Sequence, residues 1–228
     1  MEENIEGNKK LALGARLASL SYDTEDLIVE KIGELTEKET VVDFIRSDKL
    51  FGFVARYSDI AFIVFRGTTK SVDEWLNNLD FRLIMTEYGG IHKGFAESLD
   101  SISNYHLSQI IKLFDKPYKI HIAGHSRGGA LATLTAAVLM KNNIKPSGIY
   151  TYGSPKVGDK TFADWYDSRL KEVTIRVVNR NDPIPHLPPS FNFDDISYWS
   201  ITLFFFILKI IMIPYYIAKN VYRRFRTK

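Results

Sequence analysis

The pattern of apolar positions predicts an N-terminal helix followed by two strands. Leu13, Leu17 and Leu20 recur near helical spacing within residues 9–20, as in an amphipathic helix. Residues 51–57 and 60–65 are instead rich in aromatic and β-branched side chains, which favour strands. The second of these strands is followed directly by the turn-like sequence Arg-Gly-Thr-Thr.

The middle of the chain alternates between strand patterns and helix patterns. Strand patterns occupy residues 118–123, 148–152 and 173–178, and helix patterns occupy residues 130–140 and 159–170. Helices of this length between strands connect strands that run in parallel. We therefore expect an α/β fold with a mostly parallel sheet and helices on both of its faces.

Residues 196–218 differ in character from everything before them. Twelve of these 23 residues are Leu, Ile or Phe, and Lys209 is the only charged residue among them. A helix of this length spans about 34 Å, which is enough for a hydrocarbon core of about 30 Å. The cost of inserting Lys209, about 3 kcal/mol, is smaller than the gain of about 5 kcal/mol from the twelve apolar side chains. The pattern predicts a globular domain in residues 1–192, a membrane helix in residues 193–218 and a basic tail in residues 219–228.

The charge and composition exclude several classes of protein. The net charge is +3, but it becomes −2 without the five cations of residues 219–228, so the basic charge belongs to the tail. A nucleic-acid-binding domain carries its basic residues on a folded face, and we expect no nucleic-acid partner. The chain has no cysteine, which excludes a disulfide scaffold, a thiolate metal site and a cysteine nucleophile.

The N-terminal segment bears on the location of the protein. It is polar and acidic, and the first apolar run is interrupted by Arg16, so it lacks the apolar core of a signal peptide. With a single apolar segment near the C-terminus, the sequence predicts an intracellular membrane protein. It does not indicate the oligomeric state.

The most informative stretch is the G-x-S-x-G pentapeptide at residues 124–128. It follows a predicted strand and precedes a predicted helix, which is the context in which a sharp turn presents a nucleophilic serine. Ser126 is therefore the candidate nucleophile. The N–H groups at the start of the following helix point toward negative charge that develops on an acyl oxygen.

A serine nucleophile requires an acid and a base that come later in the chain. Asp182 follows a predicted strand in a proline-rich loop, which suits a fixed carboxylate. Thr68 follows the strand at residues 60–65, where a second oxyanion donor is expected. His121 and His125 stand four residues apart, but on a strand and a turn rather than on one helical face, so we expect no metal.

Five motifs follow one another along residues 11–189. They are F-R-G-T at residues 65–68, H-K-G-F at 92–95, G-H-S-R-G-G at 124–129, Y-G-S-P-K-V-G at 152–158 and N-D-P-I-P-H-L-P-P at 181–189. In this order they resemble the class 3 lipases, the fungal-type triacylglycerol lipase family of α/β-hydrolases. The resemblance implies an α/β-hydrolase fold, a lipid ester substrate and no cofactor.

The resemblance also assigns roles to individual residues. It implies that Ser126 is the nucleophile and Asp182 the acid of the catalytic triad. It further implies that Thr68 and the backbone N–H of Arg127 form the oxyanion hole.

The sequence departs from the family at the catalytic base. In the family the catalytic histidine comes well after the aspartate, but residues 191–199 contain no histidine, and His186 is the one histidine that follows Asp182. Three interpretations remain open: His186 is the base, an upstream histidine is the base, or the chain is a lipase-like scaffold with little turnover. We predict a membrane-tethered serine hydrolase that cleaves lipid acyl esters with Ser126, Asp182 and His186. The alternative is an inactive scaffold that binds lipids or partners at a membrane.

Overall fold

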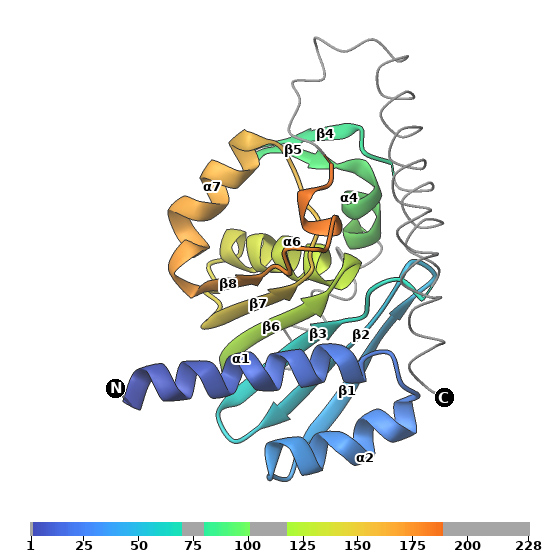
Figure 1. The fold of residues 1–228 in the computed structure, drawn as a ribbon, viewed down its shortest axis with the longest axis vertical. Coiled ribbons are helices and arrows are strands. Elements are labelled where there is room, and N and C mark those ends of the chain that lie inside the picture. The colour runs from blue at the N-terminus through green and yellow to red at the C-terminus, as the bar shows by residue number, and fades with distance from the viewer. Residues whose placement is uncertain (1, 70–79, 101–117, 189–228) are drawn as a thin grey trace. The chain divides into compact units, whose positions relative to one another are not determined.

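The computed structural model describes residues 2–69, 80–100 and 118–188 (Figure 1). The chain divides into two compact units, Met1–Pro188 and Pro189–Lys228, and every described residue belongs to the first. The predicted membrane helix in residues 193–218 and the basic tail in residues 219–228 lie outside the described residues. Within the described ranges, no helix is both long and apolar enough to cross a bilayer.

A six-stranded sheet forms the centre of the first unit, with the strand order β1-β2-β3-β6-β7-β8. Three of its strands make an antiparallel meander, and β3, β6, β7 and β8 pair in parallel. The strands are β1 Val41–Ser47, β2 Leu50–Tyr57, β3 Ile60–Phe65, β6 Lys119–His125, β7 Gly148–Tyr152 and β8 Thr174–Val177. The predicted α/β fold with a mostly parallel sheet is confirmed.

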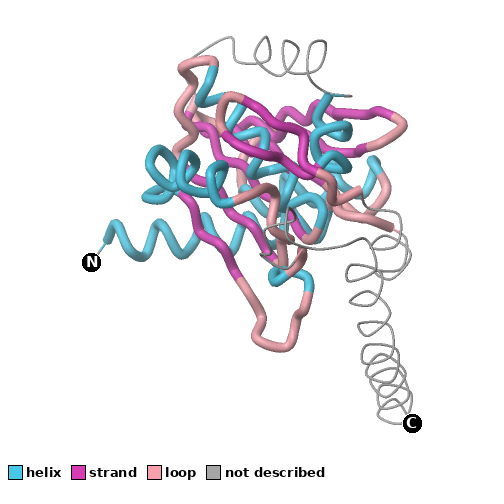
Figure 2. The backbone as a smooth tube through the Cα atoms, turned by 90° about the horizontal axis from the view of Figure 1, so that it is seen from above, coloured by secondary structure: helices cyan, strands magenta, loops and turns pink. Residues whose placement is uncertain are grey.

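Helices cover both faces of this sheet, as expected. α1 and α2 lie on one side of the strands in Figure 1, and α4, α6 and α7 lie on the other. Figure 2 shows the strands crossing the middle of the described part with helices around them. The helices are α1 Glu2–Leu20, α2 Glu25–Thr36, α4 Lys93–Asp100, α6 Arg127–Lys141 and α7 Lys160–Leu170, with short 3-10 turns η1 Lys171–Val173 and η2 Ile184–His186.

A separate two-stranded hairpin of β4 Leu83–Thr86 and β5 Gly89–His92 precedes α4. The side chain of His92 is buried, and its Nδ1 lies 2.8 Å from the carbonyl oxygen of Phe81, which ties the hairpin to the segment before it. The helix α4 begins directly after His92, and residues 101–117 lie outside the described part of the chain.

The core between α1, α2 and the sheet is built from large apolar side chains. Leu17 of α1 and Ile28 of α2 are fully buried against Phe53 and Phe62 of the sheet. Each such side chain contributes roughly 1.5–3 kcal/mol of hydrophobic free energy. Because α1 packs across β3, β6 and β7, the chain segment that follows α1 begins close to the carboxyl ends of these strands.

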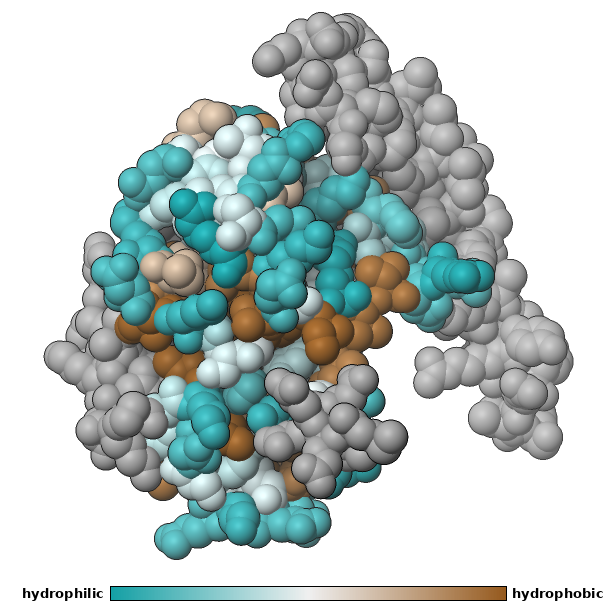
Figure 3. Space-filling model, turned by 90° about the vertical axis from the view of Figure 1, so that its left-hand side faces the viewer, coloured by the Kyte–Doolittle hydropathy of each residue, from teal (hydrophilic) through white to brown (hydrophobic). Residues whose placement is uncertain are grey.

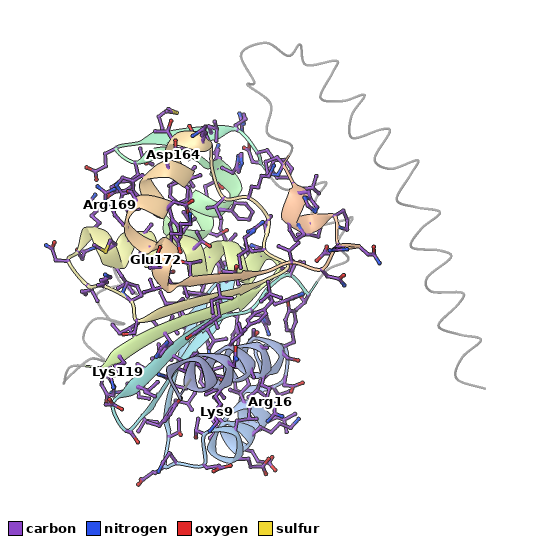
Figure 4. All side chains as sticks on the ribbon, turned by 60° about the vertical axis from the view of Figure 1, so that its left-hand side comes forward. Lys9, Arg16, Lys119, Asp164, Arg169 and Glu172 are labelled. Carbon is purple, nitrogen blue, oxygen red and sulfur yellow. The ribbon has the colours of Figure 1, made fainter. Side chains whose placement is uncertain are left out.

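The surface of the described residues carries both exposed charged side chains and exposed apolar side chains. The charged residues labelled in Figure 4 are exposed; they are Lys9, Arg16, Lys119, Asp164, Arg169 and Glu172. On the face drawn in Figure 3, apolar patches gather across the middle, between more polar regions. Exposed apolar side chains of the described residues include Ile175 and Val177 of the edge strand β8 and Met85 of the hairpin.

His121 is a buried titratable residue inside this core. Its ring, only 2% exposed, stacks between Phe62 and Tyr150 with centroid distances of 5.0 and 5.9 Å. Its Nδ1 lies 3.3 Å from the Tyr150 hydroxyl, and its Nε2 has no hydrogen-bond partner among the described residues. Burial, with smaller contributions from Lys10 and Lys119, lowers the pKa of His121 to about 4.

We expect His121 to make the fold sensitive to acid. The unfolded chain protonates this residue near its ordinary pKa of about 6.5, whereas the folded chain does so only near pH 4. Between these values the unfolded state binds more protons, so the free energy of unfolding falls as the pH is lowered, by at most about 3 kcal/mol from this residue. His121→Gln should remove this part of the pH dependence in urea unfolding curves recorded at neutral pH and near pH 4. Replacing the exposed His186 by Gln is the control, and an unchanged pH dependence in His121→Gln would contradict the prediction.

Candidate active site

Ser126 lies at the sharp turn between β6 and α6. Its backbone has φ 56° and ψ −126°, a region that residues with a Cβ rarely adopt and that costs roughly 1–3 kcal/mol. The Ser126 N–H donates to the carbonyl of Tyr152 at 2.9 Å, and the Ser126 carbonyl accepts from the N–H of Gly129 at 2.9 Å. The surrounding backbone therefore holds the serine in this strained conformation.

The two glycines of the pentapeptide allow the backbone to pack closely around this turn. A Cβ on Gly128 would lie 2.2 Å from the carbonyl oxygen of Phe65, at the end of β3. A Cβ on Gly124 would lie 2.2 Å from the carbonyl oxygen of Gly128. Because both obstacles are backbone atoms of central elements, they cannot move aside, and only glycine fits at either position. The strand–turn–helix context predicted for this motif is present.

The predicted oxyanion residues flank the serine from two sides. A Cβ on Gly67 would lie 3.4 Å from the Cβ of Ser126, so the turn that carries Thr68 is packed directly against the nucleophile. Arg127 is the first residue of α6, and its N–H forms no hydrogen bond with a described residue. The Arg127 side chain donates hydrogen bonds to the Lys49 carbonyl and, at 2.8 Å, to the Ser98 hydroxyl.

Asp182 lies at the same edge of the sheet as Ser126. Its Oδ1 accepts from the N–H of Ile184 at 3.0 Å, and its own N–H donates to the carbonyl of Asn179, so the loop that follows β8 is internally fixed. Its Oδ2 lies 2.8 Å from the position of a Cβ on Gly153, the residue that follows β7. Since Tyr152, the last residue of β7, binds the Ser126 backbone, the ends of β6 and β7 bring the predicted nucleophile and acid to one edge.

His186 is not joined to either of these residues. It is the last residue of η2, its side chain is exposed, and its backbone N–H donates to the carbonyl of Pro183 at 3.0 Å. The imidazole forms no hydrogen bond with any described residue, Ser126 and Asp182 included. The η2 turn that contains His186 is bonded to β8, because the Arg176 side chain donates a hydrogen bond to the carbonyl of Pro185 at 2.8 Å.

His125 also lies near Asp182. Its Nε2 is 3.8 Å from the position of a Cβ on Gly153, and Asp182 Oδ2 is 2.8 Å from the same point. Its Nδ1 lies 3.0 Å from the hydroxyl of Tyr22, whose ring meets the imidazole edge-on at a centroid distance of 6.0 Å. Partial burial lowers the pKa of His125, and the charge of Asp182 opposes this shift. The sequence offers no signal for the contact with Tyr22, because the two residues are 103 positions apart.

The comparisons with known proteins decide the family. The family model described as lipase (class 3) matches residues 62–192, more than half of the chain. The chain belongs to the class 3 lipase family. The matched region contains the pentapeptide, Thr68, Asp182 and His186.

Named relatives support the same assignment. The chain is 34% identical over 124 residues to a secreted mono- and diacylglycerol lipase 1 of Fusarium solani, covering 52% of this chain and 37% of that protein. It is 35% identical over 140 residues to a lipase of Rhizomucor miehei, covering 57% of this chain and 38% of that protein. The matched part is thus well under half the length of these relatives.

Solved structures agree on the fold. The Rhizomucor miehei lipase in its native propeptide complex has a TM-score of 0.67 and 27% identity, covering 83% of this chain and 65% of that one. A fungal lipase–inhibitor complex described as a model for interfacial activation has a TM-score of 0.65 and 28% identity, covering 82% of this chain and 76% of that one. The likeness therefore includes most of the described unit of this chain.

The strained serine gives a stability prediction that is independent of activity. Ser126→Gly should be more stable than Ser126→Ala by about 1 kcal/mol, because glycine adopts a positive φ without the penalty of a Cβ and is also the better residue before a helix. Urea unfolding of the two variants measures the difference. Ser19, exposed within α1, is the matched control, where the order should reverse because glycine disfavours a helix. Equal stability of the two Ser126 variants would contradict a strained turn.

Proposed function

We propose that this class 3 lipase is a serine hydrolase that cleaves the acyl ester bonds of lipids. The observation that carries the proposal is the strained turn, which holds Ser126 against the Gly67–Thr68 segment while the N–H of Arg127 stays free of described partners. Strain of this kind, maintained by its surroundings, is typical of functional sites. It sets a hydroxyl beside donors placed to bind an oxyanion.

The proposed reaction follows from these roles. Ser126 Oγ attacks the ester carbonyl carbon, a histidine accepts its proton, and the carbonyl oxygen gains a negative charge bound by Thr68 and the Arg127 N–H. The alcohol then leaves with the proton from the histidine, and a water molecule hydrolyses the acyl-serine through the same histidine. Asp182 stabilises the imidazolium that forms in each step.

His186 is our candidate for this base, on grounds of availability. His92 is buried and bonded to Phe81, His121 is buried away from the site, and His125 is bonded to Tyr22. Among the described histidines, His186 alone is exposed and without a hydrogen bond. It follows Asp182 by four residues, in the loop after β8.

The relatives support a glyceride as the substrate. The Fusarium solani protein is named a secreted mono- and diacylglycerol lipase, and the Rhizomucor miehei protein a lipase. We infer that the chain acts on uncharged acylglycerols. The described residues contain no cluster of three or more His, Cys, Asp or Glu side chains suited to a metal, and the proposed chemistry needs none.

Labelling with a fluorophosphonate tests the proposed reaction. We expect the full chain to be labelled at Ser126, Ser126→Ala to lose the label, and Ser168→Ala, at an exposed serine of α7, to keep it. His186→Gln should lower the labelling rate by about 10²- to 10⁴-fold, as loss of a general base does. Mass spectrometry of the labelled peptide and the time course of labelling give both results.

The outcomes separate the proposals. A labelling rate unchanged in His186→Gln contradicts His186 as the base but leaves Ser126 as the nucleophile. Folded wild-type protein that neither labels nor hydrolyses a short-chain ester contradicts the hydrolase proposal and supports the inactive lipid-binding scaffold instead.

We also propose that residues 196–218 tether the enzyme to a membrane. Their length and composition support insertion, and the five cations of residues 219–228 favour the cytosolic leaflet, which supports an intracellular membrane. The full chain should remain in the membrane pellet after alkaline carbonate washing. A double substitution of Phe205 and Ile207 by Asp should release it, because two acids outweigh the apolar gain. Lys209→Ala is the control that should stay bound, and a wild-type chain in the supernatant would overturn the proposal.

A further inference from the structure

Tyr22 reaches the site from a distant part of the chain. It lies in the turn between α1 and α2, and its hydroxyl is 3.0 Å from His125 Nδ1. The close contact of α1 with the sheet determines where this turn lies. Tyr22 thus links the N-terminal helices to the residue that immediately precedes the nucleophile.

The same hydroxyl also contacts the oxyanion side of the site. A Cβ on Gly67 would lie 2.2 Å from the Tyr22 oxygen and 2.7 Å from the His125 carbonyl oxygen, so no side chain fits between them. Burial raises the pKa of Tyr22, and the backbone of Gly67 and the charge of Arg66 oppose this shift. The Tyr22 hydroxyl is therefore in contact with both Gly67 and His125.

The chemistry of these groups specifies where the protons lie. The Tyr22 hydroxyl packs against Gly67 and lies 3.0 Å from His125 Nδ1, and we assign its O–H as the donor to this nitrogen. A neutral imidazole with an accepting Nδ1 carries its proton on Nε2. His125 Nε2 and Asp182 Oδ2 both lie close to the position of a Cβ on Gly153, at 3.8 and 2.8 Å, and the negative charge of Asp182 favours a proton on Nε2.

We propose, resting on the proposed function, that Tyr22 and His125 are positioning residues that couple the Gly67–Thr68 segment to Asp182. These residues form a series of neighbouring groups. It begins at Gly67, continues through the Tyr22 hydroxyl and the His125 ring, and ends at the Asp182 carboxylate. It fixes the oxyanion segment and the triad acid relative to each other on either side of Ser126. Because Nδ1 lies at hydrogen-bond distance from Tyr22 and Nε2 lies near Gly153, as Asp182 does, we assign His125 the positioning of these groups and not the role of base for Ser126.

Tyr22→Phe tests this series, because it removes one hydroxyl and keeps the ring. The full chain in detergent micelles, labelled with ¹⁵N-histidine, is studied by two-bond ¹H–¹⁵N correlation at a pH well above the ordinary histidine pKa of about 6.5. We expect His125, assigned by its loss in His125→Gln, to show the Nε2–H tautomer in the wild type and a mixture of tautomers in Tyr22→Phe. We also expect Ser126 of Tyr22→Phe to react with a fluorophosphonate about five- to tenfold more slowly, the usual effect of losing one supporting hydrogen bond.

Tyr57→Phe is the matched control. Tyr57 ends β2 at the edge of the sheet opposite to Ser126, since it pairs with Ile60 whereas Phe65 pairs with Gly124. This variant should keep the wild-type tautomer and labelling rate, even if its stability falls. If the role of Tyr22 is purely structural, Tyr22→Phe should likewise lower only the stability of the protein and leave the His125 tautomer and the labelling rate unchanged.

Each outcome decides the matter. A wild-type tautomer in Tyr22→Phe, or an unchanged labelling rate with an altered tautomer, overturns the positioning role while the hydrolase proposal stands. Absence of labelling in the folded wild type overturns the proposed hydrolysis, and the catalytic purpose of the series with it. A changed tautomer together with slower labelling supports the proposal.

Discussion

The structure depends on how closely three backbone segments approach one another where β6 turns into α6. Gly124 lies against Gly128, and Gly128 against the end of β3, with no room for a side chain at either glycine. This contact forces the chain to turn within one residue and leaves Ser126 at a positive φ. The strain is maintained by the central strands of the sheet, because relieving it would require β3 and β6 to separate.

The helices on the other face of the sheet also contribute to the site. α1 packs across the parallel strands through Leu17, and the turn that follows it presents Tyr22 to His125 and Gly67. The burial that stabilises the fold thus also fixes a polar group at the site. Conditions that loosen α1 from the sheet should therefore disturb the site before they unfold the strands.

The regular elements were predictable where their patterns were strong. The parallel strands and α6 were found because their apolar runs are bounded by turn residues, and residues 124–128 identified the nucleophile turn. The strand β1 and the helix α2 were missed. β1 is an edge strand and carries the charged residues Asp43 and Arg46 among its apolar residues. These charges weaken the apolar pattern by which a strand is recognised. The length of α1 was also underestimated, because its first turns are polar.

The sequence by itself determined the class of fold, the turn that holds Ser126 and the loop that holds Asp182, because each depends on local backbone requirements that glycine, proline and strand patterns express directly. Only the tertiary structure decided which side chains surround them. It placed His125 near Asp182, left His186 exposed without a hydrogen bond to any described residue, and brought Tyr22 to His125 from over a hundred residues away. Such contacts depend on how whole helices pack against a sheet, and no short stretch of sequence records that packing.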